Sequence, residues 1–319
     1  MEIQRDFIKM RPEGLYCPAG FFFLDPQKPV SHAVISHAHA DHAVPDNRNV
    51  YCSGGTAFLI NQRYGNRAGG KISTFRFGES FEINGVKITL FPAGHIMGSA
   101  QVLMEYKGCR YLYTGDFKLQ EDDTAEPFEF VKTDMLITET TFASPDVSHP
   151  SVELEMQKLN TYSGKNILIG AYVLGKSQRL TSLVNQYCQE KTLLIHSSIA
   201  AYHRVYEKRG MKLGTWQPYK RNLFKVFSNS IYIVPPYVFQ NYRGNKDYLQ
   251  AFATGWDKRF ENCDIELRIS DHADWNDILR LIKETEPKAI LCVHGSGKHI
   301  EEYFSGSQIE IIPHSEIAF

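Results

Sequence analysis

The chain has 319 residues, of which 43% are hydrophobic and 22% charged, and its 35 basic side chains nearly balance 36 acidic ones. A chain of this length and apolar content can bury a large core, which excludes intrinsic disorder and a small disulfide-stapled fold. The near-zero net charge excludes a whole-molecule attraction to nucleic acid or membrane, so a polyanion would need a local basic patch.

The N-terminal residues do not follow a signal-peptide pattern, and no stretch approaches the roughly 18 apolar residues that cross a bilayer. The six cysteines are scattered and form no C-x-x-C pair, which is typical of a protein kept reduced. We therefore expect a cytoplasmic protein with no membrane partner.

Up to about residue 140 the pattern predicts mostly strands joined by short turns. An apolar strand is expected at 33–36 and another at 135–138. Asn84-Gly85 and Lys107-Gly108 each separate two alternating segments, which is the pattern of a tight hairpin. The predicted hairpins pair 80–83 with 86–91 and 102–106 with 110–113.

From about residue 165 to 255 strands and helices alternate, which is typical of a parallel α/β unit. The strands are expected at 166–170, 192–196 and 231–234, and the helices at 176–189 and 200–209. Beyond the unit we expect strands at 266–269, 289–293 and 309–312, and helices from 274 and at 298–304. The sequence therefore predicts a strand-rich domain interrupted by an α/β insertion.

The sharpest motif is the segment His37-Ala38-His39-Ala40-Asp41-His42, directly after the strand at 33–36. In an extended or tightly turned segment His37 and His39 project the same way and can bind one metal, while Asp41 and His42 can bind a second. Two ions about 3.5–4 Å apart could clamp the oxygens of a phosphodiester. The plainer alternative is a helix N-terminus with solvated histidines.

Further ligands are available where other predicted strands end. His95 follows Gly94, Asp116 follows Thr114-Gly115, and His294 lies between Val293 and Gly295. Each alone could be a turn residue beside a glycine. Together they would complete two coordination shells, with the carboxylate of Asp116 bridging both ions.

These motifs, in this order, resemble the metallo-β-lactamase superfamily, which implies an αββα sandwich with two metals at one edge. The segments around Glu139 (138–140), His272 (270–274) and His294 (293–295) are similar to the three further motifs of the β-CASP branch of nucleases. The resemblance extends from about residue 15 to 300. Segments 253–256 and 270–275 look most like bacterial ligase-associated DNA exonucleases.

The resemblance implies a metallo-β-lactamase domain at 1–163 and 262–319 and a β-CASP insertion at 164–261. It also implies two divalent ions, zinc being expected and manganese the alternative. The implied ligands are His37, His39, His95 and Asp116 for one ion, and Asp41, His42, Asp116 and His294 for the other. The implied catalytic residues are Asp41, Glu139 and His272, where a carboxylate-oriented imidazole could protonate the leaving oxygen.

Residues 170–177 also match the phosphate-loop pattern G-x-x-x-x-G-K-[ST], an alternative that would predict nucleotide hydrolysis. The bulky apolar residues 171–174 are poorly suited to wrapping a pyrophosphate. The family resemblance instead implies that Lys176, Gln178 and Arg179 contact nucleic acid, and Lys258 and Arg259 are further candidates. Basic residues between 176 and 225 are interleaved with aromatic ones, which predicts a single-strand groove. Those aromatic residues are Tyr202, Tyr206, Trp216 and Tyr219.

The function that follows is a two-metal phosphodiesterase that degrades DNA as an exonuclease in repair. Its expected substrates are single-stranded DNA or duplex ends, and an ATP-dependent DNA ligase and a helicase are its expected pathway partners. An RNA nuclease of the same branch is the alternative, because His294 is typical of RNA-processing members. A catalytically inactive nucleic-acid-binding module is an alternative of another class, and the complete set of seven metal-type residues argues against it.

Overall fold

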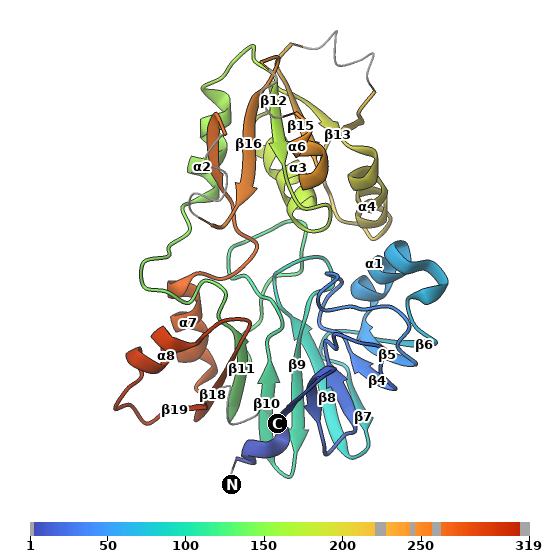
Figure 1. Ribbon diagram of the computed structural model, residues 1–319, viewed down its shortest axis with the longest axis vertical. Coiled ribbons are helices and arrows are strands. Elements are labelled where there is room, and N and C mark those ends of the chain that lie inside the picture. The colour runs from blue at the N-terminus through green and yellow to red at the C-terminus, as the bar shows by residue number, and fades with distance from the viewer. Residues whose placement is uncertain (1–2, 221–227, 243–245, 257–262, 313–319) are drawn as a thin grey trace. The chain divides into compact units, whose positions relative to one another are not determined.

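The computed structural model describes residues 3–220, 228–242, 246–256 and 263–312 (Figure 1). The candidate nucleic-acid contacts Lys258 and Arg259 lie outside these ranges. The chain forms two compact units: the first comprises Met1–Glu121, Ala125–Ser148 and His272–Phe319, and the second comprises Asp122–Thr124 and His149–Asp271. Within the described ranges, no helix combines the length and the apolar content that a bilayer crossing requires.

The first unit contains two sheets that share one core. In spatial order the first sheet comprises β1 (Lys9–Arg11), β2 (Gly14–Cys17), β3 (Phe22–Leu24), β4 (His32–Val34), β5 (Asn49–Ser53) and β6 (Lys71–Phe75). The second comprises β19 (Glu310–Ile312), β18 (Ala289–Val293), β11 (Met135–Glu139), β10 (Cys109–Tyr113), β9 (Ala100–Tyr106), β8 (Val86–Pro92) and β7 (Ser80–Ile83). Leu15 and Phe22 of the first sheet belong to the same buried cluster as Val102 and Tyr111 of the second.

Helices complete the first unit. They are η1 (Arg5–Phe7), α1 (Gly54–Tyr64), η2 (Gly65–Arg67), α7 (Trp275–Thr285) and α8 (Lys298–Tyr303). α7 begins at the N-cap Asp274, whose side chain accepts a hydrogen bond from the backbone N of Asp277. Its apolar face places Ile278 and Leu281 against Leu136 of the second sheet, while α1 packs on β5 and β6. The predicted αββα sandwich is therefore confirmed.

The hairpins of the second sheet form where the sequence predicts them. Asn84 and Gly85 have φ of 48° and 83°, and Lys107 and Gly108 have φ of 48° and 81°. Two consecutive left-handed residues make the turn whose twist matches that of antiparallel strands. The pairing of β7 with β8 and of β9 with β10 follows from these turns.

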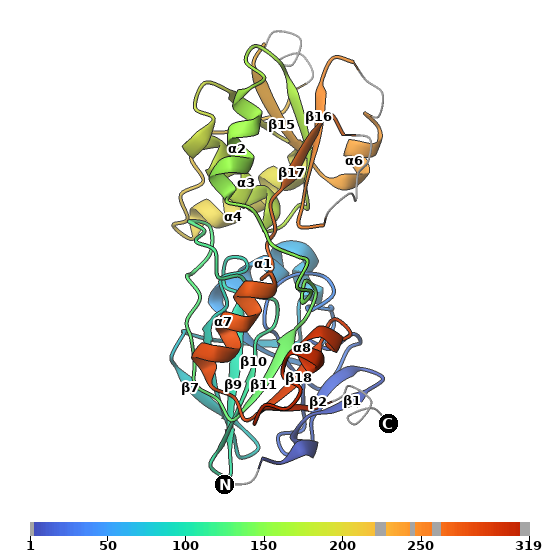
Figure 2. The same ribbon diagram turned by 90° about the vertical axis from the view of Figure 1, so that its left-hand side faces the viewer.

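The second unit is an α/β unit with a sheet of six parallel strands. In spatial order they are β14 (Gln217–Pro218), β13 (Thr192–Ile195), β15 (Ser230–Val234), β12 (Ile167–Gly170), β16 (Leu249–Thr254) and β17 (Ile265–Arg268). Its helices are α2 (Val152–Asn160), α3 (Lys176–Tyr187), α4 (Ser197–Lys208) and α6 (Pro236–Gln240). α2, α3 and α4 cover one face and α6 the other (Figure 2). The inserted α/β unit predicted from the sequence is present.

The second unit extends beyond the predicted limits of 164 and 261. β17 belongs to it because it pairs with β16, and α2 belongs to it because it packs on α3 and β17. α1 lies in a region where mostly strands and short turns were expected. Its start is set by Ser53, whose hydroxyl accepts a hydrogen bond from the backbone N of Thr56.

Candidate metal centre

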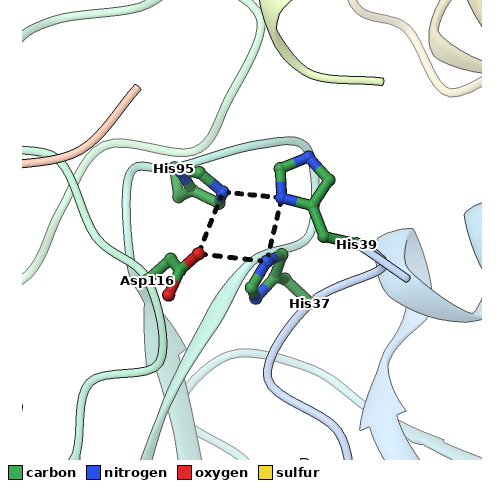
Figure 3. A group of neighbouring side chains, drawn as sticks. All are labelled: His37, His39, His95 and Asp116. Carbon is green, nitrogen blue, oxygen red and sulfur yellow. Dashed lines mark hydrogen bonds and ion pairs between the residues drawn. The ribbon is translucent and has the colours of Figure 1, made fainter. Parts of the chain in front are cut away.

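Three imidazoles converge in the first unit. His37 and His39 lie in the loop after β4, and His95 lies in the loop after β8. Nδ1 of His39 lies 3.1 Å from Nε2 of His37 and 3.0 Å from Nε2 of His95 (Figure 3). His37 and His95 are buried, so few water molecules can compete for these nitrogens.

The carboxylate of Asp116 completes this group. It follows β10, and its Oδ2 lies 3.6 Å from Nε2 of His37 and 3.8 Å from Nε2 of His95. Its other oxygen, Oδ1, lies 3.3 Å from Nε2 of His42. One carboxylate therefore faces two clusters of nitrogen ligands, as the bridging role requires.

Two glycines allow the loops to approach one another. Gly115 has φ of 55°, and a Cβ there would lie 2.7 Å from the side chain of Ser36. Gly94 has φ of 73°, and its Cβ would lie 2.2 Å from the backbone oxygen of Lys118. The residues before His95 and Asp116 are therefore glycines for a steric reason as well as for their backbone angle.

The donor set of His37, His39, His95 and Asp116 fits a divalent metal ion. Four nitrogen or oxygen ligands around one zinc lie about 3.3 Å apart, and the four distances above lie on either side of that value. Burial, together with His42 and His39, lowers the pKa of His37 well below its usual value, which keeps its Nε2 lone pair available. Burial alone would raise the pKa of Asp116, but the surrounding histidines outweigh it and hold the pKa below its usual range.

Asp25 is a buried site residue that the sequence motifs did not reveal. Its Oδ2 accepts hydrogen bonds from Nδ1 of His42 at 2.8 Å and from the hydroxyl of Tyr113 at 2.9 Å. Its Oδ1 accepts one from the backbone N of Ser36 at 2.7 Å, and the Ser36 hydroxyl donates to Oδ2. A carboxylate directly after β3 and before Pro26 was the available signal.

His42 experiences a strongly negative environment. Burial alone would lower its pKa, but the carboxylates of Asp116 and Asp25 outweigh burial and raise the pKa to about 10. The surroundings of His42 thus favour positive charge, which a bound cation would supply. His42, Asp25 and His37 have ligand atoms close enough together to form a candidate metal-binding group of their own.

The other predicted ligands of the second ion lie near His42. Oδ2 of Asp41 is 3.9 Å from Nε2 of His42, and the ring of His294 is centred 5.0 Å from that of His42. The side chain of Asp41 is 76% exposed, and His294, at φ of 52°, is also exposed. This half of the site is more open than the buried half around His37.

Glu139 and His272 form a pair next to Asp116. Nδ1 of His272 donates to Glu139, with 2.9 Å to Oε2 and 3.1 Å to Oε1. The buried Glu139 carboxylate also accepts hydrogen bonds from the backbone N of Phe117 at 2.8 Å and from the hydroxyl of Thr141 at 2.7 Å. These bonds fix the ring of His272 and put its proton on Nδ1, so that Nε2 carries the lone pair.

The predicted nucleic-acid contacts Lys176, Gln178 and Arg179 are buried. Nζ of Lys176 donates to the backbone oxygen of Ile269 at 2.5 Å and lies 3.2 Å from Oδ2 of Asp271. The guanidinium of Arg179 donates to the backbone oxygen of Ser270 and lies 3.5 Å from Asp122 and from Asp271. These bonds are those of residues that stabilise the second unit, and a phosphate contact through them stays a prediction without structural support.

Gln178 has a local role in the same loop. Its Oε1 accepts a hydrogen bond from the backbone N of Gly175, and its Nε2 donates to the backbone oxygen of Val173. The hydroxyl and backbone N of Ser177 donate to the backbone oxygen of Tyr172. The phosphate-loop alternative is disfavoured, because Lys176 and these carbonyls are engaged with the unit itself.

Of the four aromatic residues expected in a single-strand groove, three pack against the core of the second unit, and Tyr202 is half-buried. Tyr206 is buried, and Tyr219 stacks on Tyr232 with ring centroids 4.1 Å apart. Trp216 packs on the core, and its indole nitrogen donates to Glu207. They contribute to the core because α4 packs on the sheet and β14 pairs with β13 at its edge, a placement that a composition argument could not detect.

Comparison with known proteins agrees with this site. Residues 20–169 match the family model described as Beta-lactamase superfamily domain, and residues 262–310 match the one described as Zn-dependent metallo-hydrolase RNA specificity domain. The chain is 36% identical over 137 residues to the cleavage and polyadenylation specificity factor subunit 3 of Dictyostelium discoideum. The chain belongs to the β-CASP branch of the metallo-β-lactamase superfamily.

Other relatives differ in how much of their length they share with the chain. It is 32% identical over 298 residues, or 88% of its length, to a probable DNA ligase of Opitutus terrae, of which it spans 28%. The match to the Dictyostelium subunit takes in 40% of this chain and 17% of that protein. The chain therefore spans less than a third of the Opitutus protein and of the Dictyostelium protein. An RNase J-like protein of Methanocaldococcus jannaschii is 29% identical, over 52% of this chain and 46% of that protein.

A solved structure shares the fold. The crystal structure of a protein of unknown function from Enterococcus faecalis superposes with a TM-score of 0.62, covering 90% of this chain and 80% of that one. The sequence identity is 16%, so this likeness concerns the fold alone.

Proposed function

We propose that the protein is a metal-dependent phosphodiesterase that degrades DNA as an exonuclease. The observation that carries the proposal is the carboxylate of Asp116, whose Oδ2 faces His37 and His95 while its Oδ1 faces His42. Such a two-sided arrangement suits two divalent ions and one phosphodiester between them. Zinc is the expected metal, and manganese is the alternative for the same nitrogen and oxygen ligands.

The residues divide the chemistry among themselves. Divalent ions held there would act as Lewis acids toward the phosphodiester and make the attacking water more acidic. Glu139 holds His272 through Nδ1, and an imidazolium formed when Nε2 takes up a proton from water could pass that proton to the leaving oxygen. Asp41 is exposed beside His42 and belongs to the more open half of the site, where we propose that its carboxylate helps to hold the second ion.

DNA is the proposed substrate because a relative that aligns over 298 residues, or 88% of this chain, is named a probable DNA ligase, and this chain corresponds to 28% of it. A polypeptide that carries both a ligase and a β-CASP region would trim DNA ends before sealing them. A separate ATP-dependent DNA ligase and a helicase are therefore the proposed pathway partners of this chain.

An RNA nuclease is the second candidate. The Dictyostelium and Methanocaldococcus relatives are named as polyadenylation and RNase J-like proteins, and the family model at 262–310 is described as an RNA specificity domain. The rates at which this chain degrades DNA and RNA of the same sequence distinguish the two candidates.

A comparison of linear with circular single-stranded DNA tests the exonuclease. The holoenzyme should degrade the linear strand and leave the circle intact, because an exonuclease needs an end. Asp116→Asn should abolish degradation, while Asp146→Asn, at an exposed aspartate of the same unit, should not. Cleavage of the circle at the rate of the linear strand would contradict the exonuclease assignment, and an active Asp116→Asn variant would contradict the site.

A further inference from the structure

Exposed aromatic side chains gather at one edge of the sheet in the second unit. Within the described part of that unit, the strongly exposed large aromatic residues are Tyr172 (50%), Tyr237 (61%) and Trp256 (44%). They follow β12, β15 and β16, which are neighbours in a parallel sheet. The three residues therefore extend from the same carboxyl edge. β12 lies between β15 and β16, about 4.8 Å from each.

This edge contains the switch point of the sheet. From β12 the chain runs through α3 to β13 on one side, and from β15 it runs through α6 to β16 on the other. α3 and α6 lie on opposite faces of the sheet (Figure 2). Ligands of open α/β sheets bind outside the carboxyl ends of the strands where such connections diverge. Tyr172 and Tyr237 are the first large side chains beyond that point.

The rings are exposed on well-anchored backbone. The backbone oxygen of Tyr172 accepts two hydrogen bonds from Ser177, one from its hydroxyl at 2.6 Å and one from its backbone N at 3.2 Å. Tyr237 is the second residue of α6, after the N-cap Pro235 and Pro236, and its ring lies edge-on to that of His196, with centroids 6.3 Å apart. Rings held in place before binding lose little entropy when a ligand stacks on them.

We propose that Tyr172, Tyr237 and Trp256 form a base-stacking platform for single-stranded DNA. Stacking suits a nuclease that must accept every base, because every base has a flat aromatic face. The platform describes how the single-stranded DNA of the proposed function would bind. The proposal of the platform therefore rests on that function. It replaces the predicted groove of Tyr202, Tyr206, Trp216 and Tyr219, of which the last three pack against the core of the unit.

Kinetics of the holoenzyme on a short thymidine strand test the platform. The double variant Tyr172→Leu/Tyr237→Leu should raise KM about 100-fold, or about tenfold per ring, with kcat little changed. Its kcat on bis(4-nitrophenyl) phosphate, which has no base, should equal that of the wild type. The matching Phe double variant keeps both rings and should retain the wild-type KM, and Tyr303→Leu, at a 60% exposed tyrosine of the first unit, should also retain it.

An abasic strand of the same length provides a test that needs no substitution. The wild type should show the raised KM on it, and the Leu double variant should raise that KM no further. A wild-type KM for the Leu variant on the thymidine strand, or equal losses for the Leu and Phe variants, would overturn the platform while leaving the nuclease intact. A wild-type protein that cleaves neither DNA nor RNA would overturn the proposed function, and the platform with it.

Discussion

Asp25 accepts a hydrogen bond from Nδ1 of His42 at 2.8 Å, and Nε2 of the same ring lies 3.3 Å from Oδ1 of Asp116. The bond fixes the orientation of the His42 ring and leaves Nε2 on the side of Asp116, where the two carboxylates favour a positive charge on the ring or a bound cation. A buried carboxylate before the metal-type motif therefore orients one of the ligands within it. Asp25 is a positioning residue, since it acts through His42.

Asp25→Asn should lower the affinity for a second divalent ion about 10- to 100-fold. The groups around the carboxylate are donors, and the amide would place its own donor among them. Metal titration with ion counting by mass spectrometry measures this affinity. Tyr113→Phe, which removes one of the donors, should have a smaller effect. Unchanged affinity in Asp25→Asn would show that His42 is oriented without Asp25.

Gly115→Ala should destabilise the first unit and weaken metal binding, because its Cβ would lie 2.7 Å from Ser36. Gly65 has the same φ of 55° with nothing within 4 Å of its Cβ, so Gly65→Ala isolates the cost of the backbone angle alone. We expect a loss of unfolding free energy of about 1–3 kcal/mol for Gly65→Ala, whose ψ of −126° lies outside the left-handed helical region, and a larger loss for Gly115→Ala. Equal losses in urea denaturation would show that the approach to Ser36 can relax.

The sequence predicted which of the proposed metal ligands lie close together better than it predicted the burial of the basic residues in the second unit. His37 and His39 follow β4, and His95 and Asp116 each follow a glycine that the close approach of the loops requires, so local chemistry and local backbone point to the same place. Asp25 was missed because its hydrogen-bond donors lie up to 88 residues away in the chain. Lys176 and Arg179 were assigned to nucleic acid because charge in a sequence does not reveal burial. Both side chains are buried because they donate hydrogen bonds to the backbone oxygens of Ile269 and Ser270, which are distant in the sequence.

Lys176→Met should destabilise the second unit by about 3–5 kcal/mol, because it leaves the buried carboxylate of Asp271 without one cation. Urea denaturation measures the loss. If Lys176 contacted a phosphate instead, the variant would keep its stability and the salt dependence of DNA binding would fall by about one phosphate contact. Lys212→Met, at an exposed lysine of the same unit, is the matched control.

The second unit should lose stability in mild acid through His203. Burial lowers the pKa of His203 from 6.5 to about 4, with the backbone oxygen of Ile199 opposing the shift in part. Nδ1 accepts from Gln178, and Nε2 donates to Thr181, whose hydroxyl itself donates to the backbone oxygen of Ser177, so the bonds suit the neutral ring.

The unfolded chain therefore binds a proton at His203 more readily than the folded chain between pH 6.5 and 4, and stability falls as the pH drops through that window. The loss from this group between pH 7 and 5 should be about 2 kcal/mol. His203→Gln cannot titrate, so the difference in unfolding free energy between wild type and variant should shrink by that amount. A constant difference at both pH values would contradict this assignment.

Initial rates on single-stranded DNA and RNA of identical sequence test the central claim most directly. Both strands should carry the same end label, with the end phosphate present or absent, and the holoenzyme should be compared with Asp116→Asn. We expect DNA to be degraded faster than RNA, and the variant to degrade neither. RNA degraded faster than DNA would contradict the DNA exonuclease and favour the RNA nuclease, and cleavage by Asp116→Asn would contradict the metal centre itself.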